Sequence, residues 1–472
     1  MVLKTLAFVV ESLVVCGLYV TSYLIRPIPF FSMYGCLLLL FFLIQAMSSY
    51  LNHRKNKTLI GSLSPSRKKS IRLLVVGHRE KKEYWIRCLE SIRTIPKTNV
   101  HGIYIIIDGN EPDDYYMYHL AREYLHGVPH VQTYMVEKRG KRGLLSMGFK
   151  YIRNDLVLEY GSKILRETWP LVVVVDSDTE LEPESLLRLE EVMADPNNGC
   201  ATGVLRIYNT QDGLLPKMIA TRYQYAFTIE RACLSYFGCM TCCSGPLSIY
   251  RVCALHDEIL ERFATQTVYG ELCEPGDDRH LTNLIMAQGY RSRQTSLAVA
   301  ATEAPAEMRR FLLQQLRWSR SFFREVYWQL KCLEHHSWFL GIATVYELFF
   351  PFMILCWLCV LLYLPHDYLL YTEAIAVAFG IIVLRTLFMF VQSRDPLLWY
   401  NLLYLPMYFI FLLPIKIYAA GTARDSSWVT PDRSGLTRVM PPYLFFFLFI
   451  GAWQLVLLFG ILVTGLHWAH VW

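Results

Sequence analysis

Charged residues are scarce in this sequence, and their scarcity limits the classes of protein to which it can belong. Only 18% of the 472 residues are charged, whereas 54% are hydrophobic and the mean hydropathy is +0.28. This composition excludes an intrinsically disordered chain, which requires low hydrophobicity and high charge. The formal net charge of +6 is small, and most basic clusters lie beside apolar runs. A nucleic-acid partner is therefore not expected.

Regular cysteine spacing is also missing. The thirteen cysteines are scattered, and the one CxxC, at Cys239 and Cys242, has no second Cys or His pair at zinc-ribbon spacing. This pattern argues against a zinc module and against a disulfide framework. We interpret the cysteines as a reduced, cytosolic set that packs mostly as small hydrophobic side chains.

Long apolar runs are abundant, and they are confined to the two ends of the chain. Residues 5–25 and 28–48 are each long enough to cross a hydrocarbon core of about 30 Å. Since neither resembles a cleaved signal, we expect a transmembrane hairpin over residues 1–50. The basic stretch 53–72 that follows predicts that the middle of the chain is cytosolic. Further apolar runs predict spans at 338–363, 369–391 and 442–469.

The apolar run at 398–420 has two interpretations. It is long enough to span, but Pro406 and Pro414 interrupt it and Lys416 lies near its end. If it spans, the basic loop after it lies outside the cell; if it is interfacial, that loop stays cytosolic. The distribution of Lys and Arg favours the second arrangement. We therefore expect five spans: a hairpin at 338–392 and a last helix at 441–472, separated by an interfacial helix and loop at 393–440.

Residues 51–307 predict a soluble α/β domain. Three short β-branched runs, Leu73–Gly77, Gly102–Ile107 and Leu171–Val175, each lead into a polar or acidic residue. A helical pattern at Glu80–Arg93 separates the first two runs. Such units build a mostly parallel sheet, which binds ligands at the carboxyl ends of its strands.

Two acidic motifs follow from this pattern. Asp176 and Asp178, one residue apart at a strand end, are typical ligands for a hard divalent cation and, through it, for a diphosphate. Asp-rich turns are also common without a metal, so this signal alone is weak. Asp277 and Asp278 either cap the start of a helix or provide a general base.

A third motif lies on the amphipathic segment 308–337, where basic and aromatic residues alternate. This composition predicts helices in the membrane interface. Gln314, Arg317 and Trp318 share one helical face because they are spaced i, i+3 and i+4. They either anchor the helix in the membrane or close over a sugar diphosphate.

The DxD pair, the later Asp and the QxxRW motif, in this order before a membrane block, resemble the signature of processive family-2 glycosyltransferases. That group includes cellulose, chitin and hyaluronan synthases. Several longer stretches are similar to class I hyaluronan synthases of the animal type, over about residues 50 to 440. These stretches are 107–110, 229–238, 243–247, 276–283 and 317–321.

The resemblance implies a multi-pass helical membrane protein with a cytosolic GT-A-like domain, located in the plasma membrane. It further implies inverting transfer from UDP-GlcNAc and UDP-GlcA with Mg²⁺ or Mn²⁺. The partners would be these donors, the growing hyaluronan polymer and the lipid bilayer. A chitin or chitin-oligosaccharide synthase that uses UDP-GlcNAc alone is the alternative. A non-catalytic membrane scaffold is disfavoured because Asp178, Asp277 and Trp318 are all present.

The resemblance also assigns roles to individual residues. Asp277 matches the base that deprotonates the acceptor hydroxyl, and Asp178 with Asp176 matches the metal site. Any of three cations, Arg279, Arg317 and Arg320, is a candidate to face the donor sugar. The residues matched to UDP-sugar binding are His78, Glu80, Asp108, Lys141, Arg142, Asp176, Gln314, Arg317 and Trp318.

The acceptor site and a gating loop are matched last. Cys242 and Trp318 would line the acceptor site. Trp428, Thr430 and Arg433 match the family's gating loop, whose other positions differ here: they are Val429, Pro431 and Asp432. Because proline fixes φ and valine restricts the backbone, the loop is expected to be stiffer than in the family.

Overall fold

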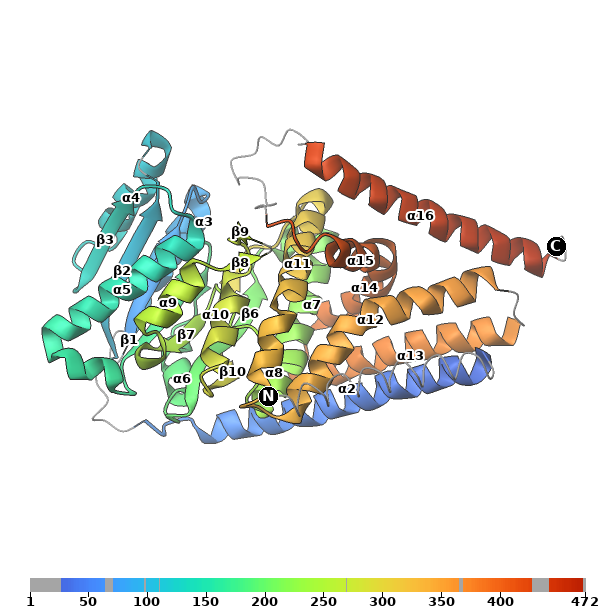
Figure 1. The fold of residues 1–472 in the computed structure, drawn as a ribbon, viewed down its shortest axis with the longest axis horizontal. Coiled ribbons are helices and arrows are strands. Elements are labelled where there is room, and N and C mark those ends of the chain that lie inside the picture. The colour runs from blue at the N-terminus through green and yellow to red at the C-terminus, as the bar shows by residue number, and fades with distance from the viewer. Residues whose placement is uncertain are drawn as a thin grey trace.

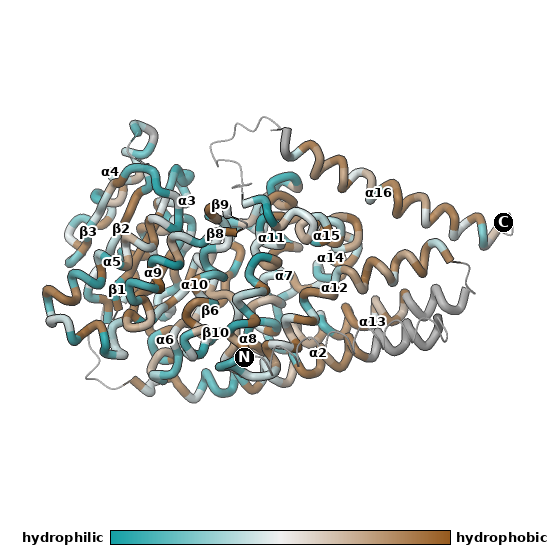
Figure 2. Tube along the Cα trace, viewed as in Figure 1, coloured by the Kyte–Doolittle hydropathy of each residue, from teal (hydrophilic) through white to brown (hydrophobic). Residues whose placement is uncertain are grey.

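The computed structural model describes residues 27–63, 71–96, 99–109, 111–268, 270–364, 368–426 and 441–469. An α/β domain occupies one end of the molecule, and long helices extend from it to the other end (Figure 1). The hydrophobic residues are concentrated on these long helices, whereas the helices of the α/β domain are mixed in character (Figure 2).

The α/β domain is built on a sheet of eight strands in the order β3-β2-β1-β4-β7-β6-β10-β5. The pairs β1–β2, β2–β3, β1–β4 and β6–β10 are parallel, whereas β7 runs antiparallel to both of its neighbours. The mostly parallel sheet predicted from the sequence is therefore confirmed. The strands are β1 (Ile71–Gly77), β2 (Val100–Asp108), β3 (Val131–Val136), β4 (Leu171–Asp176), β5 (Glu180–Leu181), β6 (Asn198–Ile207), β7 (Ser248–Arg251) and β10 (Arg291–Thr302); β8 (Thr267–Val268) and β9 (Glu271–Leu272) pair separately.

Helices cover both faces of this sheet. Alternate residues of β1 point to opposite faces, so Leu73 packs in one core with α3 and Leu74 in the other with α5. Trp85 of α3 and Phe149 of α5 are completely buried in these two cores. The helices of the domain are α3 (Lys82–Thr94), α4 (Pro112–Tyr124), α5 (Gly140–Tyr160), α6 (Ser185–Val192), α7 (Leu214–Tyr225), α8 (Arg231–Tyr236), α9 (Asp257–Ala264) and α10 (Asp277–Met286), with a π-helix η3 (Ala226–Glu230) between α7 and α8 and short 3₁₀ turns η1 (Ser162–Arg166), η2 (Thr210–Asp212) and η4 (Val252–Ala254).

Four segments among the described residues are long and apolar enough to cross a membrane. They are Trp338–Tyr363, Ile375–Ser393, Pro396–Gly421 and Tyr443–His467. The chain is therefore a membrane protein, as predicted, and the first expected span, 5–25, lies outside the described residues. The long helices are α2 (Pro27–Thr58), α11 (Met308–Cys332), α12 (Trp338–Tyr363), α13 (Tyr368–Ser393) and α16 (Pro441–Trp468).

The segment 396–421 is not one continuous α-helix. It consists of η5 (Pro396–Tyr400), α14 (Asn401–Met407), a π-helical turn η6 (Tyr408–Leu412) and α15 (Leu413–Gly421). Prolines lie inside α14 and at the start of α15, where they remove backbone donors and disturb the regular ladder. Its length and hydropathy are sufficient for a span, and its interfacial placement stays a prediction.

The boundary predicted at residue 50 falls inside a helix. α2 continues to Thr58 without a break, because its last turns dock on the α/β domain. The side-chain amides of Asn52 and Asn56 both donate to the carbonyl oxygen of Gln294, at 3.1 and 2.9 Å. These contacts join α2 directly to β10.

Candidate functional site

The acidic residues predicted at strand ends do meet at one edge of the sheet. Asp176 ends β4, Asp108 ends β2, and His78 follows β1, and these three parallel strands are neighbours. Asp178 lies in the turn after β4, where one of its carboxylate oxygens accepts from Thr302 Oγ1 at 3.3 Å. The DxD pair therefore stands at the ligand-binding edge of the sheet, as expected for parallel strands.

A cavity of about 680 Å³ begins at this edge and continues between the long helices. Its wall contains both DxD carboxylates and also apolar residues of α2, α12 and α13, such as Phe41 and Ile382. Nine of the predicted site residues line it: Lys141, Asp176, Asp178, Cys242, Asp277, Arg279, Gln314, Arg317 and Trp318. Residues from three separate sequence motifs thus share one space, which extends toward the membrane-spanning part of the chain.

Lys141 connects the DxD pair to the second acidic motif. Its ammonium lies 2.7 Å from Asp176 Oδ1 and 3.5 Å from Asp277 Oδ2. Burial raises the pKa of Asp176, the charge of Asp178 raises it further, and Lys141 offsets part of this effect. The lysine therefore balances carboxylates that would otherwise repel one another in a desolvated site.

Asp277 has the position and charge that a general base needs. It is the first residue of α10 and follows Gly276, whose φ of 88° is left-handed. A side chain there would overlap Ser321, so glycine is required by both conformation and space. Burial raises the pKa of Asp277, but Lys141, Arg142 and Arg317 outweigh it and bring the pKa below the ordinary value. The carboxylate is thus ionised at neutral pH and can accept a proton.

The QxxRW residues form another side of the cavity, on α11. Gln314, Arg317 and Trp318 all line it, as their i, i+3, i+4 spacing requires. The Trp318 side chain is 39% exposed, and its ring centroid lies 6.4 Å from that of Tyr223 on α7. A partly exposed indole beside a tyrosine is a suitable surface for the apolar face of a sugar ring.

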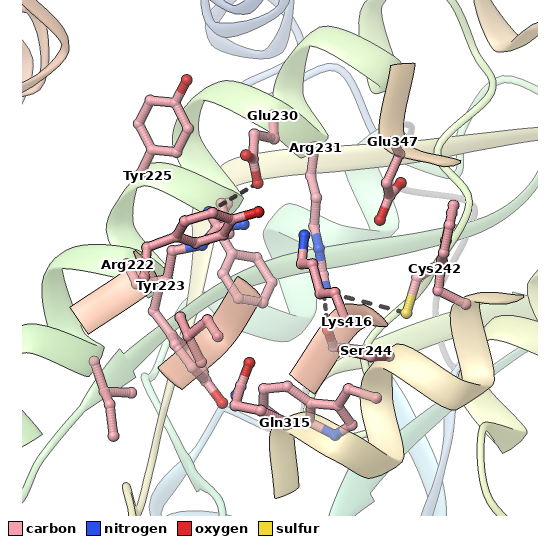
Figure 3. A pocket seen from close by; sticks show the side chains of 18 of the residues that line it. Arg222, Tyr223, Tyr225, Glu230, Arg231, Cys242, Ser244, Gln315, Glu347 and Lys416 are labelled. Atoms are coloured by element: carbon pink, nitrogen blue, oxygen red, sulfur yellow. Dashed lines mark hydrogen bonds and ion pairs between the residues drawn. The ribbon is translucent and has the colours of Figure 1, made fainter. Parts of the chain in front are cut away.

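Cys242 faces the cavity as a polar contact rather than as a nucleophile. Its thiol donates to Asp278 Oδ2 at 3.3 Å and lies 4.0 Å from a guanidinium nitrogen of Arg231. Burial and the charge of Asp278 raise the pKa of this thiol, so that it stays protonated. Figure 3 shows Arg231 projecting between Cys242 and Ser244, with Lys416 and Glu347 entering the same cavity from other helices.

Three residues assigned to UDP binding lie at the sheet edge but outside the wall of this cavity. His78 Nδ1 is 2.7 Å from the carbonyl oxygen of Asp108. Both oxygens of the Asp108 carboxylate accept from backbone N–H groups, those of Arg139 and Gly140, at 2.7 and 3.1 Å. Glu80 accepts from Ser177 Oγ at 3.2 Å. Their contact with a nucleotide stays a prediction.

Two predicted arginines have other partners in the structure. Arg142 donates to the carbonyl oxygens of Phe263, Glu274 and Pro275, so it supports the loop before Asp277 instead of facing the cavity. Arg320 is buried, pairs with Asp425 at 2.8 Å and donates to Thr422. Both side chains have acceptors within the protein, and the phosphate contact of Arg142 and the sugar contact of Arg320 stay predictions. The gating-loop positions Trp428, Thr430 and Arg433 lie outside the described residues.

Sequence reasoning missed a second set of charged residues in the cavity wall. Arg222 and Glu230 form an ion pair of 2.8 Å there, next to Arg231. Glu347, Arg385 and Lys416 extend the set onto α12, α13 and α15. An ionisable side chain within an apolar segment is itself a signal of function, and it would have identified these last three residues.

Comparison with known proteins agrees with this geometry. The sequence profile of the family described as "Glycosyltransferase like family 2" matches residues 70–321. Hyaluronan synthase 3 of Xenopus laevis is 32% identical, with 99% of this chain and 87% of the relative covered. Hyaluronan synthase 2 of Gallus gallus and hyaluronan synthase 3 of Homo sapiens are also 32% identical, with 85% of this chain and 77% of each relative covered.

Among solved structures, a mannosyltransferase of Pyrobaculum calidifontis in complex with GDP-Man and Mn²⁺ matches with a TM-score of 0.46 and 14% identity. The match covers 78% of this chain and 97% of that one. The α/β domain has a GT-A-like glycosyltransferase fold. Since relatives above 30% identity are matched over most of their length, the chain belongs to the hyaluronan synthase family of processive family 2 glycosyltransferases.

Proposed function

We propose that the protein transfers GlcNAc and GlcA alternately from their UDP-sugars to a growing hyaluronan chain and passes the chain across the membrane. The observation that carries the proposal is the continuity of one cavity. Its wall includes the DxD carboxylates, Asp277 and Trp318 at one end and residues of α12 and α13 at the other. A polymer extended at Asp277 thus has a path toward the long helices.

In this mechanism Asp277 removes the proton of the acceptor hydroxyl as that oxygen attacks the anomeric carbon of the donor. Lys141 and Arg317 lie on the cavity wall close enough to Asp277 to lower its pKa, and the same charges would attract the diphosphate. Trp318 and Tyr223 would orient the acceptor sugar. These roles agree with inverting transfer, in which base, acceptor and donor are held in line.

A divalent cation fits the DxD pair. Asp176 and Asp178 both line the cavity, and the charge of Asp178 raises the pKa of Asp176, so two like charges face the same space. Among the described residues no group of three or more His, Cys, Asp or Glu side chains is placed to hold a metal ion. The carboxylates of Asp176 and Asp178 would therefore hold Mg²⁺ or Mn²⁺ together with the diphosphate oxygens. When bound, the ion would neutralise charge on the UDP leaving group.

The cations of the cavity favour an acidic polymer over chitin, which is neutral. Beyond the DxD end the wall carries Arg222, Arg231, Arg385 and Lys416 against the carboxylates of Glu230 and Glu347. An excess of positive charge suits a chain with a carboxylate on every second sugar. We further propose that the catalytic domain faces the cytosol of the plasma membrane, where UDP-sugars are available.

The test is polymer synthesis by the purified protein in lipid with Mg²⁺ or Mn²⁺. Polymer is expected only with UDP-GlcNAc and UDP-GlcA together, and hyaluronidase should degrade it. The Asp277→Asn variant in the same lipid is the control for contaminating activity. Polymer made from UDP-GlcNAc alone and degraded by chitinase would contradict the proposed product.

A further inference from the structure

A buried carboxylate outside the cavity connects the helix of the base to the QxxRW helix. Glu325 lies on α11, eight residues after Arg317, and is 2% exposed. It does not line the cavity, so it does not touch substrate there. A carboxylate this deeply buried is costly unless donors surround it.

Three side chains supply those donors. His280 Nδ1 lies 3.1 Å from each Glu325 oxygen, and Asn283 Nδ2 donates to Oε2 at 3.0 Å. Gln266 Nε2 donates to Oε1 at 2.7 Å. Since an ionised carboxylate only accepts, His280 Nδ1 carries the proton in this contact. Burial raises the pKa of Glu325, and these three donors together lower it below its ordinary value.

The three partners of Glu325 belong to different elements. His280 and Asn283 are on α10, three and six residues after Asp277, so they share one face of the helix that begins with the base. Gln266 precedes β8 and is not on α10. Two of the three donors therefore link Glu325 to the helix of the base, and the third does not.

The start of α10 is held by the same helix α11. Gly276 packs against Ser321, and Arg324 donates to the carbonyl oxygen of Pro275 at 3.4 Å and to that of Asp425 at 3.1 Å. Ser321, Arg324 and Glu325 are four, seven and eight residues after Arg317, so these four residues lie along one side of α11. This side of α11 contacts α10 from the loop before Asp277 to Asn283.

We propose that Glu325 is a positioning residue: through His280 and Asn283 it fixes α10 and so sets the Asp277 carboxylate relative to Arg317 and the bound donor. The inference rests on the proposed role of Asp277 as base. In-line transfer is sensitive to displacements of about 1 Å, which can reduce a rate about 100-fold. A small shift of α10 would therefore lower turnover without removing any group that binds UDP.

The experiment compares variants that remove one hydrogen bond to the same carboxylate. Asn283→Ala breaks a contact to α10, and Gln266→Ala breaks the contact that does not reach α10. The kcat for UDP release, the Kd for UDP and the Tm are measured for each in lipid. We expect Asn283→Ala to lower kcat at least tenfold, Gln266→Ala to keep it within twofold, and both to keep the Kd for UDP within twofold.

A second set of variants begins with Glu325→Gln. The amide nitrogen of this glutamine cannot accept a hydrogen bond, so at least one donor of the cluster loses its acceptor. We expect a loss of kcat of at least tenfold. In the double variant Glu325→Gln with Asn283→Asp, the new amide donates to the new carboxylate while its oxygen accepts from His280 and Gln266. We expect this exchange to restore kcat to within a few-fold of wild type, which the single Asn283→Asp variant should not do.

Two outcomes overturn the inference alone. One is that Asn283→Ala and Gln266→Ala lower kcat to the same extent and in proportion to their loss of Tm, which would mean that the cluster only stabilises the fold. The other is wild-type kcat in both Asn283→Ala and Glu325→Gln while Asp277→Asn is inactive, which leaves the proposed function intact. Full activity of Asp277→Asn would instead overturn the base assignment and this inference with it. If Glu325→Gln does not fold, the comparison of Asn283→Ala with Gln266→Ala decides alone.

Discussion

At the scale of single residues, the site separates two acidic functions that resemble each other in sequence. Asp178 and Asp277 are both buried carboxylates in the wall of one cavity. Lys141, Arg142 and Arg317 bring the pKa of Asp277 below its ordinary value, whereas the pKa of Asp176 in the DxD pair is raised. Their different surroundings imply different consequences of removing the charge.

We predict that Asp277→Asn binds UDP normally but loses transfer by a factor of about 10²–10⁴, the usual contribution of general base catalysis. Asp178→Asn should instead weaken nucleotide binding in the presence of Mg²⁺ or Mn²⁺. Calorimetric titration with UDP and the rate of UDP release distinguish the two. Normal turnover in both variants would contradict the assigned roles.

A second prediction concerns Lys141 and pH. The base must be ionised, so activity is lost as the pH falls through the pKa of Asp277. Lys141 is the largest of the charges that lower this pKa, and in Lys141→Met the pKa of Asp277 should rise. The acid limb of the activity profile should then begin at higher pH than in wild type. If the activity that remains in Lys141→Met falls at the same acidic pH as in wild type, Lys141 does not set the charge state of Asp277.

At the scale of elements, the contact between α10 and α11 determines where the base lies. Gly276 adopts a φ of 88°, and an added Cβ would overlap Ser321 on α11. Gly289, in the turn after α10, has a φ of 92°, and its only neighbour would be His335 at an ordinary distance of 3.9 Å. The two glycines share the same conformation and differ in the space around them.

We predict that Gly276→Ala lowers both Tm and transfer much more than Gly289→Ala. Each substitution carries the strain of a left-handed alanine, about 1–2 kcal/mol. Only Gly276→Ala must also push α10 away from α11, and we expect it to lower the rate of UDP release more than tenfold. Thermal unfolding and the transfer assay, applied to both variants, test this prediction. Equal effects of the two substitutions would argue against close packing between Gly276 and α11.

At the scale of the whole molecule, the cavity joins two regions that are far apart in sequence. It is lined by Asp176 of the α/β domain and by Lys416, whose ammonium lies 5.9 Å from the ring centre of Phe350 and 5.7 Å from that of Tyr408. The faces of aromatic rings attract a cation, so these rings help to hold Lys416 on the cavity wall, where an anion can meet it.

We predict that Lys416→Met shortens the polymer and lowers its rate of synthesis several-fold while UDP binding is unchanged. The reason is the loss of one cation on the path of an acidic chain. Lys82→Met, at the exposed start of α3, is the matched control. Gel analysis of product length measures the effect, and normal polymer from Lys416→Met would argue against a path beside this residue.

The last prediction concerns topology. Arg320 pairs with the Asp425 carboxylate, and Arg324 donates to the carbonyl oxygen of Asp425. The segment that leads to residues 427–440 therefore contacts α11 beside the active site. We predict that residues 53–337 and 421–440 share the cytosolic side. Labelling of a cysteine placed at Arg433 by an impermeant reagent from outside the cell would contradict this arrangement.

The sequence by itself determined the α/β domain, the apolar helices and the three motifs. Each depends on local periodicity or spacing: β-branched runs become buried strands, and i, i+3, i+4 spacing places Gln314, Arg317 and Trp318 on one face. The edge at which Asp108 and Asp176 meet also follows from the parallel sheet. A resemblance in these motifs supplied the expected roles.

Only the tertiary structure decided which partner each charged side chain takes. Arg142 and Arg317 look alike in sequence, yet one holds backbone carbonyls and the other lines the cavity. Glu325 becomes informative only when α10 packs on α11, and Lys416 only when α15 reaches the cavity. The physical reason is that hydrogen bonds and ion pairs depend on distances between segments far apart in the chain, which local periodicity does not determine.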